Sequence, residues 1–143
     1  MREGIGLYRG KRKDNGEWVE GSLLTKYDVD AGCVSVYYIV QTFDFAISVD
    51  YDTNLLDDEI IEVIPETVGE YMGLTDKNGK KIFEGDIVKG YWDTIVQVVY
   101  DDCYLGFRAK EKDGMHNCID YYGLDRIEVI GNIHDNHELL QNT

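Results

Sequence analysis

Hydrophobic positions in this chain come in short runs separated by turn-forming pairs. The runs are rich in β-branched and aromatic residues, and several alternate with polar positions, as in half-buried strands. Asn15-Gly16 and Asn78-Gly79 favour two-residue type I′ turns, because Asn and Gly tolerate positive φ. The pattern predicts strands over residues 6–12, 18–27, 34–40, 45–49, 60–64, 71–75, 81–83, 87–91, 95–100, 104–110, 117–121 and 126–130.

The opening and the close of the first half recur in the second half. Tyr8-Arg9-Gly10 is followed, after four residues, by Asn15-Gly16, and Tyr71-Met72-Gly73 is followed at the same distance by Asn78-Gly79. Each half closes on Ile-Glu-Val-Ile, at residues 61–64 and 127–130. These matches indicate a duplicated β unit. We therefore predict a mainly β protein of two small barrel-type units packed together, residues 1–65 and 66–143.

One short helix is predicted, at the C-terminus. Asp135 can accept a hydrogen bond from the first amides of a helix, and Glu138 can return one, which is a capping-box variant. Leu139 and Leu140 would then pack on the second unit. The acidic segment 50–59 is expected as an exposed loop or a single helical turn.

The net charge of −14 is divided evenly between the halves and limits the partners. Such a chain repels a phosphate backbone, so we expect no direct binding to nucleic acid. Anionic membrane surfaces are disfavoured for the same reason. A unit of about 60 residues is only marginally stable alone, so we expect the halves to pack against each other.

The cysteines indicate a reducing compartment. Cys33, Cys103 and Cys118 are widely separated, and no Cys-x-x-Cys pair is present. The N-terminus lacks the apolar run of a signal peptide, and no segment approaches the ~20 apolar residues of a membrane span. We expect a cytoplasmic protein that makes no membrane contact.

Two groups of residues could form a metal site or a catalytic site, and each lacks some of the residues that such a site needs. His134 and His137 have the spacing of neighbours on a helix, but neither paired cysteines nor a third histidine lies nearby. His116 and Cys118 would share a face of a strand. No motif would orient this pair for catalysis, and no Gly-rich loop is present that could form an oxyanion hole. We assign no catalytic residue, no metal ligand and no cofactor.

Aromatic residues flanked by acids form the candidate partner-binding site. Exposed Tyr and Trp are typical of interface hot spots, and acids beside them would suit an extended basic or proline-rich peptide. The site requires the turns at residues 90–94 and 100–106 to lie at one end of the barrel. Its residues are Tyr91, Trp92, Asp101, Asp102 and Tyr104.

Two stretches resemble the signature of the YopX family, small proteins of bacteriophages and prophages. One is TVGEYMGLTDKNGKKIFEGDIV at residues 67–88, and the other is VIGNIHDN at residues 129–136, followed by Glu138-Leu139-Leu140. The first half matches more loosely, through residues 9–12 and 16–21. The resemblance implies a β-rich fold with SH3-like barrel character. It implies no activity and transfers no catalytic residue.

We predict a phage or prophage accessory protein, without enzymatic activity, that binds an unidentified host or phage protein in the bacterial cytosol. Exposed strand edges also make a homo-oligomer possible. One alternative is an acidic decoy that mimics nucleic acid and inhibits a host DNA-binding protein; it requires carboxylates in rows along one face. A second alternative is a cryptic hydrolase or metal-dependent enzyme; it requires His116, Cys118 and an acid to meet in one pocket.

Overall fold

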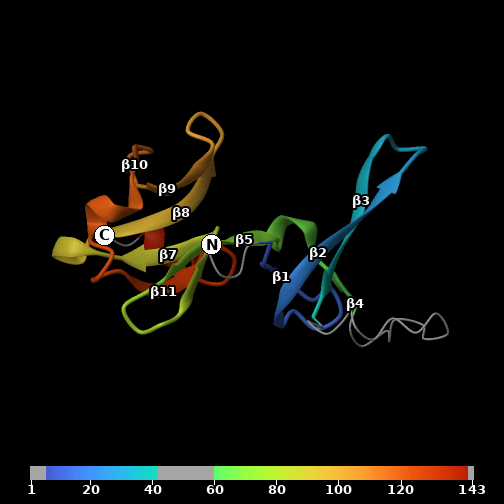
Figure 1. Cartoon of the computed structure of the whole chain (residues 1–143), viewed down its shortest axis with the longest axis horizontal. Helices are drawn as coiled ribbons and strands as arrows, with labels where there is room; N and C mark the ends of the chain where they lie inside the picture. The colour runs from blue at the N-terminus through green and yellow to red at the C-terminus, as the bar shows by residue number, and fades with distance from the viewer. Residues whose placement is uncertain (1–5, 42–59, 142–143) are drawn as a thin grey trace. The chain divides into compact units, whose positions relative to one another are not determined.

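The computed structural model describes residues 6–41 and 60–141, so the expected strand at 45–49 and the acidic segment 50–59 lie outside the described residues. The chain is mainly β, with antiparallel sheets and short 3-10 turns (Figure 1). Contacts divide the described residues into two compact units, one up to residue 70 and one from residue 71 onward.

The first unit is built on an antiparallel meander. Its strands follow one another in the order β4-β3-β2-β1, and each pairs with its neighbour in sequence. A 3-10 turn and a further strand follow, and Gly69 and Glu70 of that strand pair with β1. The elements are β1 (Tyr8–Lys11), β2 (Trp18–Asp28), β3 (Cys33–Val40), β4 (Ile60–Val63), η1 (Pro65–Thr67) and β5 (Gly69–Thr75).

Alternation along these strands places aliphatic side chains on one face. Val19, Ile39, Ile61 and Val63 form a buried cluster, while neighbouring positions in β2 point to solvent. Arg9 is also buried, and its guanidinium lies 4.7 Å from the Trp18 ring centroid.

In the second unit, the last strand returns to the first strand of the sheet. The order is β10-β9-β8-β7-β11, so β11 pairs with β7 although three strands separate them in sequence. A hairpin of β5 and β6 precedes this sheet. The elements are β6 (Lys81–Phe83), β7 (Asp86–Lys89), η2 (Tyr91–Asp93), β8 (Ile95–Asp101), β9 (Gly106–Lys110), β10 (His116–Asn117), η3 (Ile119–Tyr122), β11 (Glu128–Asn132) and η4 (His137–Leu140).

β8 is the central strand of this sheet and carries the clearest alternation. Val96 and Val98 are fully buried, whereas the alternate positions Ile95, Gln97 and Val99 are only partly buried. The buried face joins Ile82, Val88, Ala109, Ile119, Tyr122 and Ile127 in one core. Within the described residues, neither sheet closes into a barrel, so the predicted barrel closure is absent.

The Asn-Gly turns differ from the predicted two-residue type. Gly16 and Gly79 have φ of +75° and +82°, but Asn15 and Asn78 do not have positive φ, which a type I′ turn requires. At the second turn, the Asp76 carboxylate accepts hydrogen bonds from the amides of Asn78 and Lys80, both at 2.9 Å. At this second turn the prediction was wrong because a side-chain acceptor before the turn selects a wider turn. At the first turn the Asn15 side-chain oxygen accepts from the Glu17 amide at 2.9 Å.

The predicted duplication is matched only in part. In both halves the closing segment contacts the opening one: the Lys13 amide donates to the Glu62 carbonyl, and the Lys77 amide donates to the Ile127 carbonyl. The strand pairings then differ, because β4 pairs with the preceding β3 whereas β11 returns to β7.

Two predictions near the C-terminus were wrong. The strand expected at 117–121 ends at Asn117, because the chain turns into η3, where the Tyr121 amide donates to the Cys118 carbonyl. The expected C-terminal helix is a single 3-10 turn, η4, which begins after Asn136 without a side-chain cap. The capping box fails because the Asn132 carboxamide oxygen already accepts from the amides of His134 and Asp135.

Candidate functional site

The turn η2 displays Trp92 to solvent in a strained backbone conformation. Trp92 and Asp93 have φ of 56° and 57°, in the left-handed region, which costs a residue with a Cβ roughly 1–2 kcal/mol. The turn is closed by the Gly90 amide donating to the Thr94 carbonyl at 2.9 Å. The Trp92 side chain is nevertheless 85% exposed. Strain that exposes a large aromatic side chain points to function rather than packing.

A second 3-10 turn, η3, packs directly against η2. Gly123 has φ +85°, and a Cβ there would lie 2.4 Å from the Tyr91 ring. A Cβ on Gly90 would likewise lie 2.5 Å from the Tyr122 carbonyl oxygen. The two turns can therefore approach this closely only because glycine stands at both contacts.

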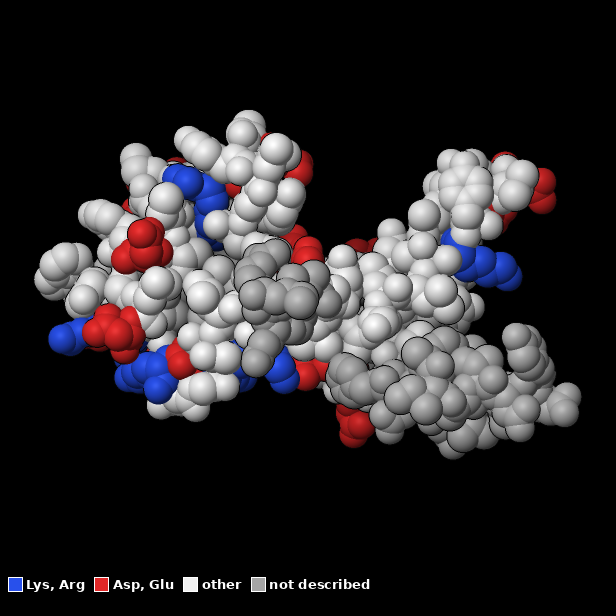
Figure 2. All heavy atoms as spheres, in the orientation of Figure 1, with Lys and Arg blue, Asp and Glu red and all other residues white. Residues whose placement is uncertain are grey.

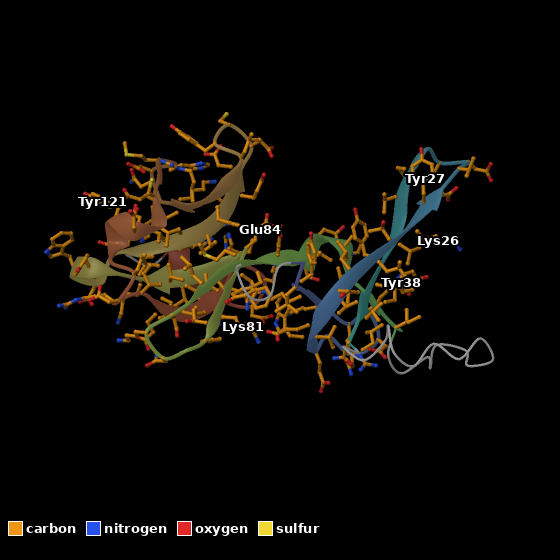
Figure 3. All side chains as sticks on the ribbon, in the orientation of Figure 1. Lys26, Tyr27, Tyr38, Lys81, Glu84 and Tyr121 are labelled. Carbon is orange, nitrogen blue, oxygen red and sulfur yellow. The ribbon has the colours of Figure 1, made fainter. Side chains whose placement is uncertain are left out.

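The packed turns carry the side chains that we call the aromatic surface: half-buried Tyr91 and exposed Trp92, Tyr121 and Leu124. The Tyr91 and Trp92 ring centroids lie 5.5 Å apart, and Tyr121 and Leu124 are exposed. Figure 3 labels Tyr121, on η3. The Arg126 guanidinium lies 5.2 Å from the Tyr91 ring centroid and fixes one edge of this surface.

Beneath the aromatic surface, Tyr122 anchors η3 to β9. Its hydroxyl donates to the Glu111 carboxylate at 2.6 Å and accepts from the Asn117 side-chain amide at 3.0 Å. Burial and the bond to Glu111 raise the pKa of Tyr122 to about 12. The hydroxyl therefore stays neutral at physiological pH and acts as a structural donor.

A different cluster lies at the β8–β9 turn and is organised by Asp101. One carboxylate oxygen lies 2.6 Å from His116 Nδ1, and the other accepts from the Cys103 amide at 2.9 Å. The bond to His116 lowers the pKa of Asp101, and partial burial opposes this only in part. A single carboxylate thus ties the turn to β10.

Arg108 holds the other side of this cluster. Its guanidinium donates to Cys118 Sγ at 3.4 Å and to the His116 carbonyl at 3.3 Å, and it lies 3.9 Å from the Tyr104 ring centroid. Next to Tyr104, Leu105 is 79% exposed and has φ of 53°. This turn therefore also displays a strained hydrophobic residue.

The predicted partner site does not converge as expected. Tyr91 and Trp92 precede β8, whereas Asp101, Asp102 and Tyr104 lie at its far end, and seven residues of extended strand span roughly 20 Å. The two turns are kept apart because successive turns of an antiparallel meander lie at opposite ends of the strand that joins them. Asp101, moreover, is buried and paired, whereas Asp102 is exposed.

The structure also places the residues that were weighed for catalysis and metal binding. Asp101 and His116 are in contact, while the Cys118 thiol faces Arg108. His137 Nδ1 lies 3.2 Å from the Gln141 side-chain nitrogen. Within residues 6–41 and 60–141, no three His, Cys, Asp or Glu side chains gather as metal ligands would. All three cysteines are exposed free thiols.

Sequence reasoning missed Tyr121, Leu124 and Arg108. Tyr121 was assigned to the strand at 117–121, Leu124 lay between predicted strands, and Arg108 carried no motif. A usable signal was present in Tyr121-Tyr122-Gly123, because a glycine after two aromatic residues marks a tight turn that exposes one of them.

Two antiparallel sheets with few helices define a small, mainly β protein. A family model described as YopX protein matches residues 7–141, and the chain belongs to the YopX family. The resemblance of residues 67–88 and 129–140 is thereby confirmed.

A solved structure shares the fold. The crystal structure of protein EF1440 from Enterococcus faecalis superposes with a TM-score of 0.53 at 24% identity, over 93% of this chain and 96% of that chain. Among curated proteins, none matches the chain. Within the described residues, no helix is both long and apolar enough to cross a membrane.

Proposed function

We propose that this chain is a phage or prophage accessory protein that acts by binding another protein through the aromatic surface of its second unit. The observation that carries this proposal is Trp92, which is almost fully exposed on a backbone that is strained to display it. Tryptophan and tyrosine are the residues most enriched in interface hot spots.

The partner is an extended basic segment of that protein. Carboxylates of Asp93, Asp120 and Asp125 stand exposed beside the aromatic side chains, and the chain as a whole carries a charge of −14. Cationic side chains gain from both features, because they pair with carboxylates and lie over aromatic faces. The proposed surface keeps Tyr91 and Trp92 of the predicted site and replaces the residues of the distant turn with Tyr121 and Leu124.

SH3-like character of the second unit belongs to this proposal. Five short antiparallel strands, a 3-10 turn before the last of them, and the return of β11 to β7 support it. In such folds peptides are bound in aromatic-lined grooves. Action in the bacterial cytosol follows from the phage context.

The decoy alternative finds no support in the face drawn in Figure 2. There the carboxylates form small groups between uncharged and basic side chains, and no continuous row is visible. Several acids serve the fold instead: Asp76 and Asp86 are buried and accept backbone hydrogen bonds, and Asp14 is paired with Arg12.

The test is quantitative capture from host lysate by immobilised wild-type chain and two variants. Trp92→Ala removes the proposed hot spot, and Tyr27→Ala, an exposed aromatic of the first unit, is the matched control (Figure 3). Loss of a hot spot of about 2 kcal/mol lowers affinity roughly thirtyfold. Undiminished capture by folded Trp92→Ala would refute the proposal.

A further inference from the structure

Two surface cavities adjoin the aromatic surface along β8. The first, of about 340 Å³, is lined by Asp93, the residue after Trp92, and by Ile95. The second, of about 300 Å³, is lined by Gln97 and Leu140. Glu111 and Lys112 line both cavities. Since Ile95 and Gln97 lie on the same side of one strand, the two cavities form successive parts of one groove.

The charges along this groove change sign from one end to the other. The end next to Trp92 has the carboxylates of Asp93 and Asp113. The far end has the ammonium group of Lys110. Lys112 lies where the cavities meet, and the carboxylate of Glu111 is held there by Tyr122.

We propose that the partner segment continues from the aromatic surface into this groove in a fixed direction, with a basic side chain near Asp93 and Asp113 and an acidic side chain near Lys110. This inference rests on the proposed function and specifies its ligand. The five residues from Asp93 to Gln97 cover roughly 13 Å, so the two charges of an extended peptide lie about four residues apart. A segment bound in the reverse direction would place like charges together, which disfavours it.

Besides its charged residues, the groove is lined by apolar and uncharged polar side chains. Ile95 and Leu140 offer apolar contact, and the Gln97 carboxamide offers both a donor and an acceptor to a passing peptide backbone. The Tyr122 hydroxyl fixes the orientation of Glu111 from below. Little side-chain ordering is therefore required at this point when a peptide binds.

The experiment is selection of peptides from a displayed library of random sequences by the full chain. Wild type is expected to enrich peptides in which Lys or Arg and, about four positions away, Asp or Glu occur predominantly in one order along the peptide; enrichment of both orders equally would contradict a fixed direction. The variant Lys110→Glu/Lys112→Glu is expected to bind the selected peptide about tenfold more weakly and to select a second basic residue in place of the acid. The control Lys13→Glu/Lys26→Glu makes the same change of net charge in the first unit and is expected to bind within about twofold of wild type.

The outcomes separate this inference from the proposed function. Enriched peptides whose binding depends on Trp92 but is unchanged by Lys110→Glu/Lys112→Glu would overturn the groove and leave the aromatic surface standing. No enrichment by wild type, or enrichment indifferent to Trp92→Ala, would overturn both. Urea unfolding of each variant shows whether it is folded, and single Lys110→Gln replaces the double variant if that fails to fold.

Discussion

Asp76 is the strongest structural carboxylate in the second unit, and its removal gives a demanding prediction. The side chain is 7% exposed and accepts three backbone hydrogen bonds of 2.9 Å: Oδ1 takes the amides of Asn78 and Lys80, and Oδ2 takes the amide of Val129. Asp76 therefore fixes the β5–β6 turn and joins it to Val129 of β11. The proposed substitution is Asp76→Asn.

The expected cost follows from the geometry. Asn keeps one oxygen for Asn78 and Lys80, but its amino group then faces the Val129 amide, so two donors meet. A buried unsatisfied donor costs about 1–3 kcal/mol, and loss of the negative charge weakens the remaining bonds. We expect Asp76→Asn to lower the free energy of unfolding by about 2–3 kcal/mol at pH 7.

The pH dependence has a defined sign. Burial of Asp76 favours its neutral form, but the three backbone amides outweigh this and lower its pKa below the ordinary value. A lowered pKa gives stability that is complete above the unfolded pKa of about 3.9 and is lost as the pH falls through the folded pKa. The difference between wild type and Asp76→Asn should therefore shrink below about pH 4.

Urea unfolding at pH 7 and at pH 3 measures both effects. Asp113→Asn is the matched control, because Asp113 accepts one amide, that of Met115, at an exposed turn. It should cost less than about 1 kcal/mol. A cost at pH 7 for Asp76→Asn equal to that of the control, or a difference that does not change with pH, would refute the reasoning.

Three further predictions concern the candidate site. Gly123→Ala should lower the free energy of unfolding by about 2–4 kcal/mol in urea, because its Cβ would overlap the Tyr91 ring at positive φ. Trp92→Gly should raise it by up to about 1 kcal/mol while abolishing partner capture, because glycine relieves the left-handed strain. Lowering the pH through the folded pKa of Asp101, below about 3.9, should release His116, seen as a titrating amide signal of Cys103 in NMR spectra.

Each of these has a control and an opposing result. Gly114→Ala, at φ +90° with nothing near its Cβ, isolates backbone strain from overlap, and an equal cost at both glycines would remove the packing argument. Trp92→Ala keeps the strain, so it should not be more stable than wild type. In Asp101→Asn the Cys103 signal should no longer titrate; if it does, another group is responsible.

The strands could be predicted where buried and exposed residues alternate strongly. Their ends could not be predicted where contacts between distant segments determine them. β8 follows its buried Val96 and Val98, and the sequence pattern located it to within one residue. The strand predicted at 117–121 was too long, because the chain leaves β10 for η3. The turn at η3 depends on the contact of Gly123 with Tyr91, a residue far away in the sequence. The type of the second Asn-Gly turn was mistaken for a similar reason: the Asp76 carboxylate, rather than the Asn-Gly pair, sets the hydrogen bonds.

Half of the candidate site could be predicted. Tyr91 and Trp92 were named from the sequence because Tyr and Trp on loops are typical of interface hot spots, and their role in binding stays a prediction. Asp101 was misjudged, since nothing in the sequence shows that His116, fifteen residues later, lies against it. The residues of the family signature prove structural where the structure explains them: Asp76 and Asp86 accept backbone amides, and Gly79 has positive φ. Membership of the family therefore identifies a fold more directly than a binding site.

β8 holds Trp92 and Leu105 beyond its two ends, and its own inward side chains are fully buried. Their separation is thus set by the covalent length of a strand, roughly 20 Å, and cannot adapt to a ligand. A bivalent molecule gains avidity only if its linker spans that length, which takes at least about six extended residues. Shorter tethers would engage one end and leave the other empty, whatever the affinity of each.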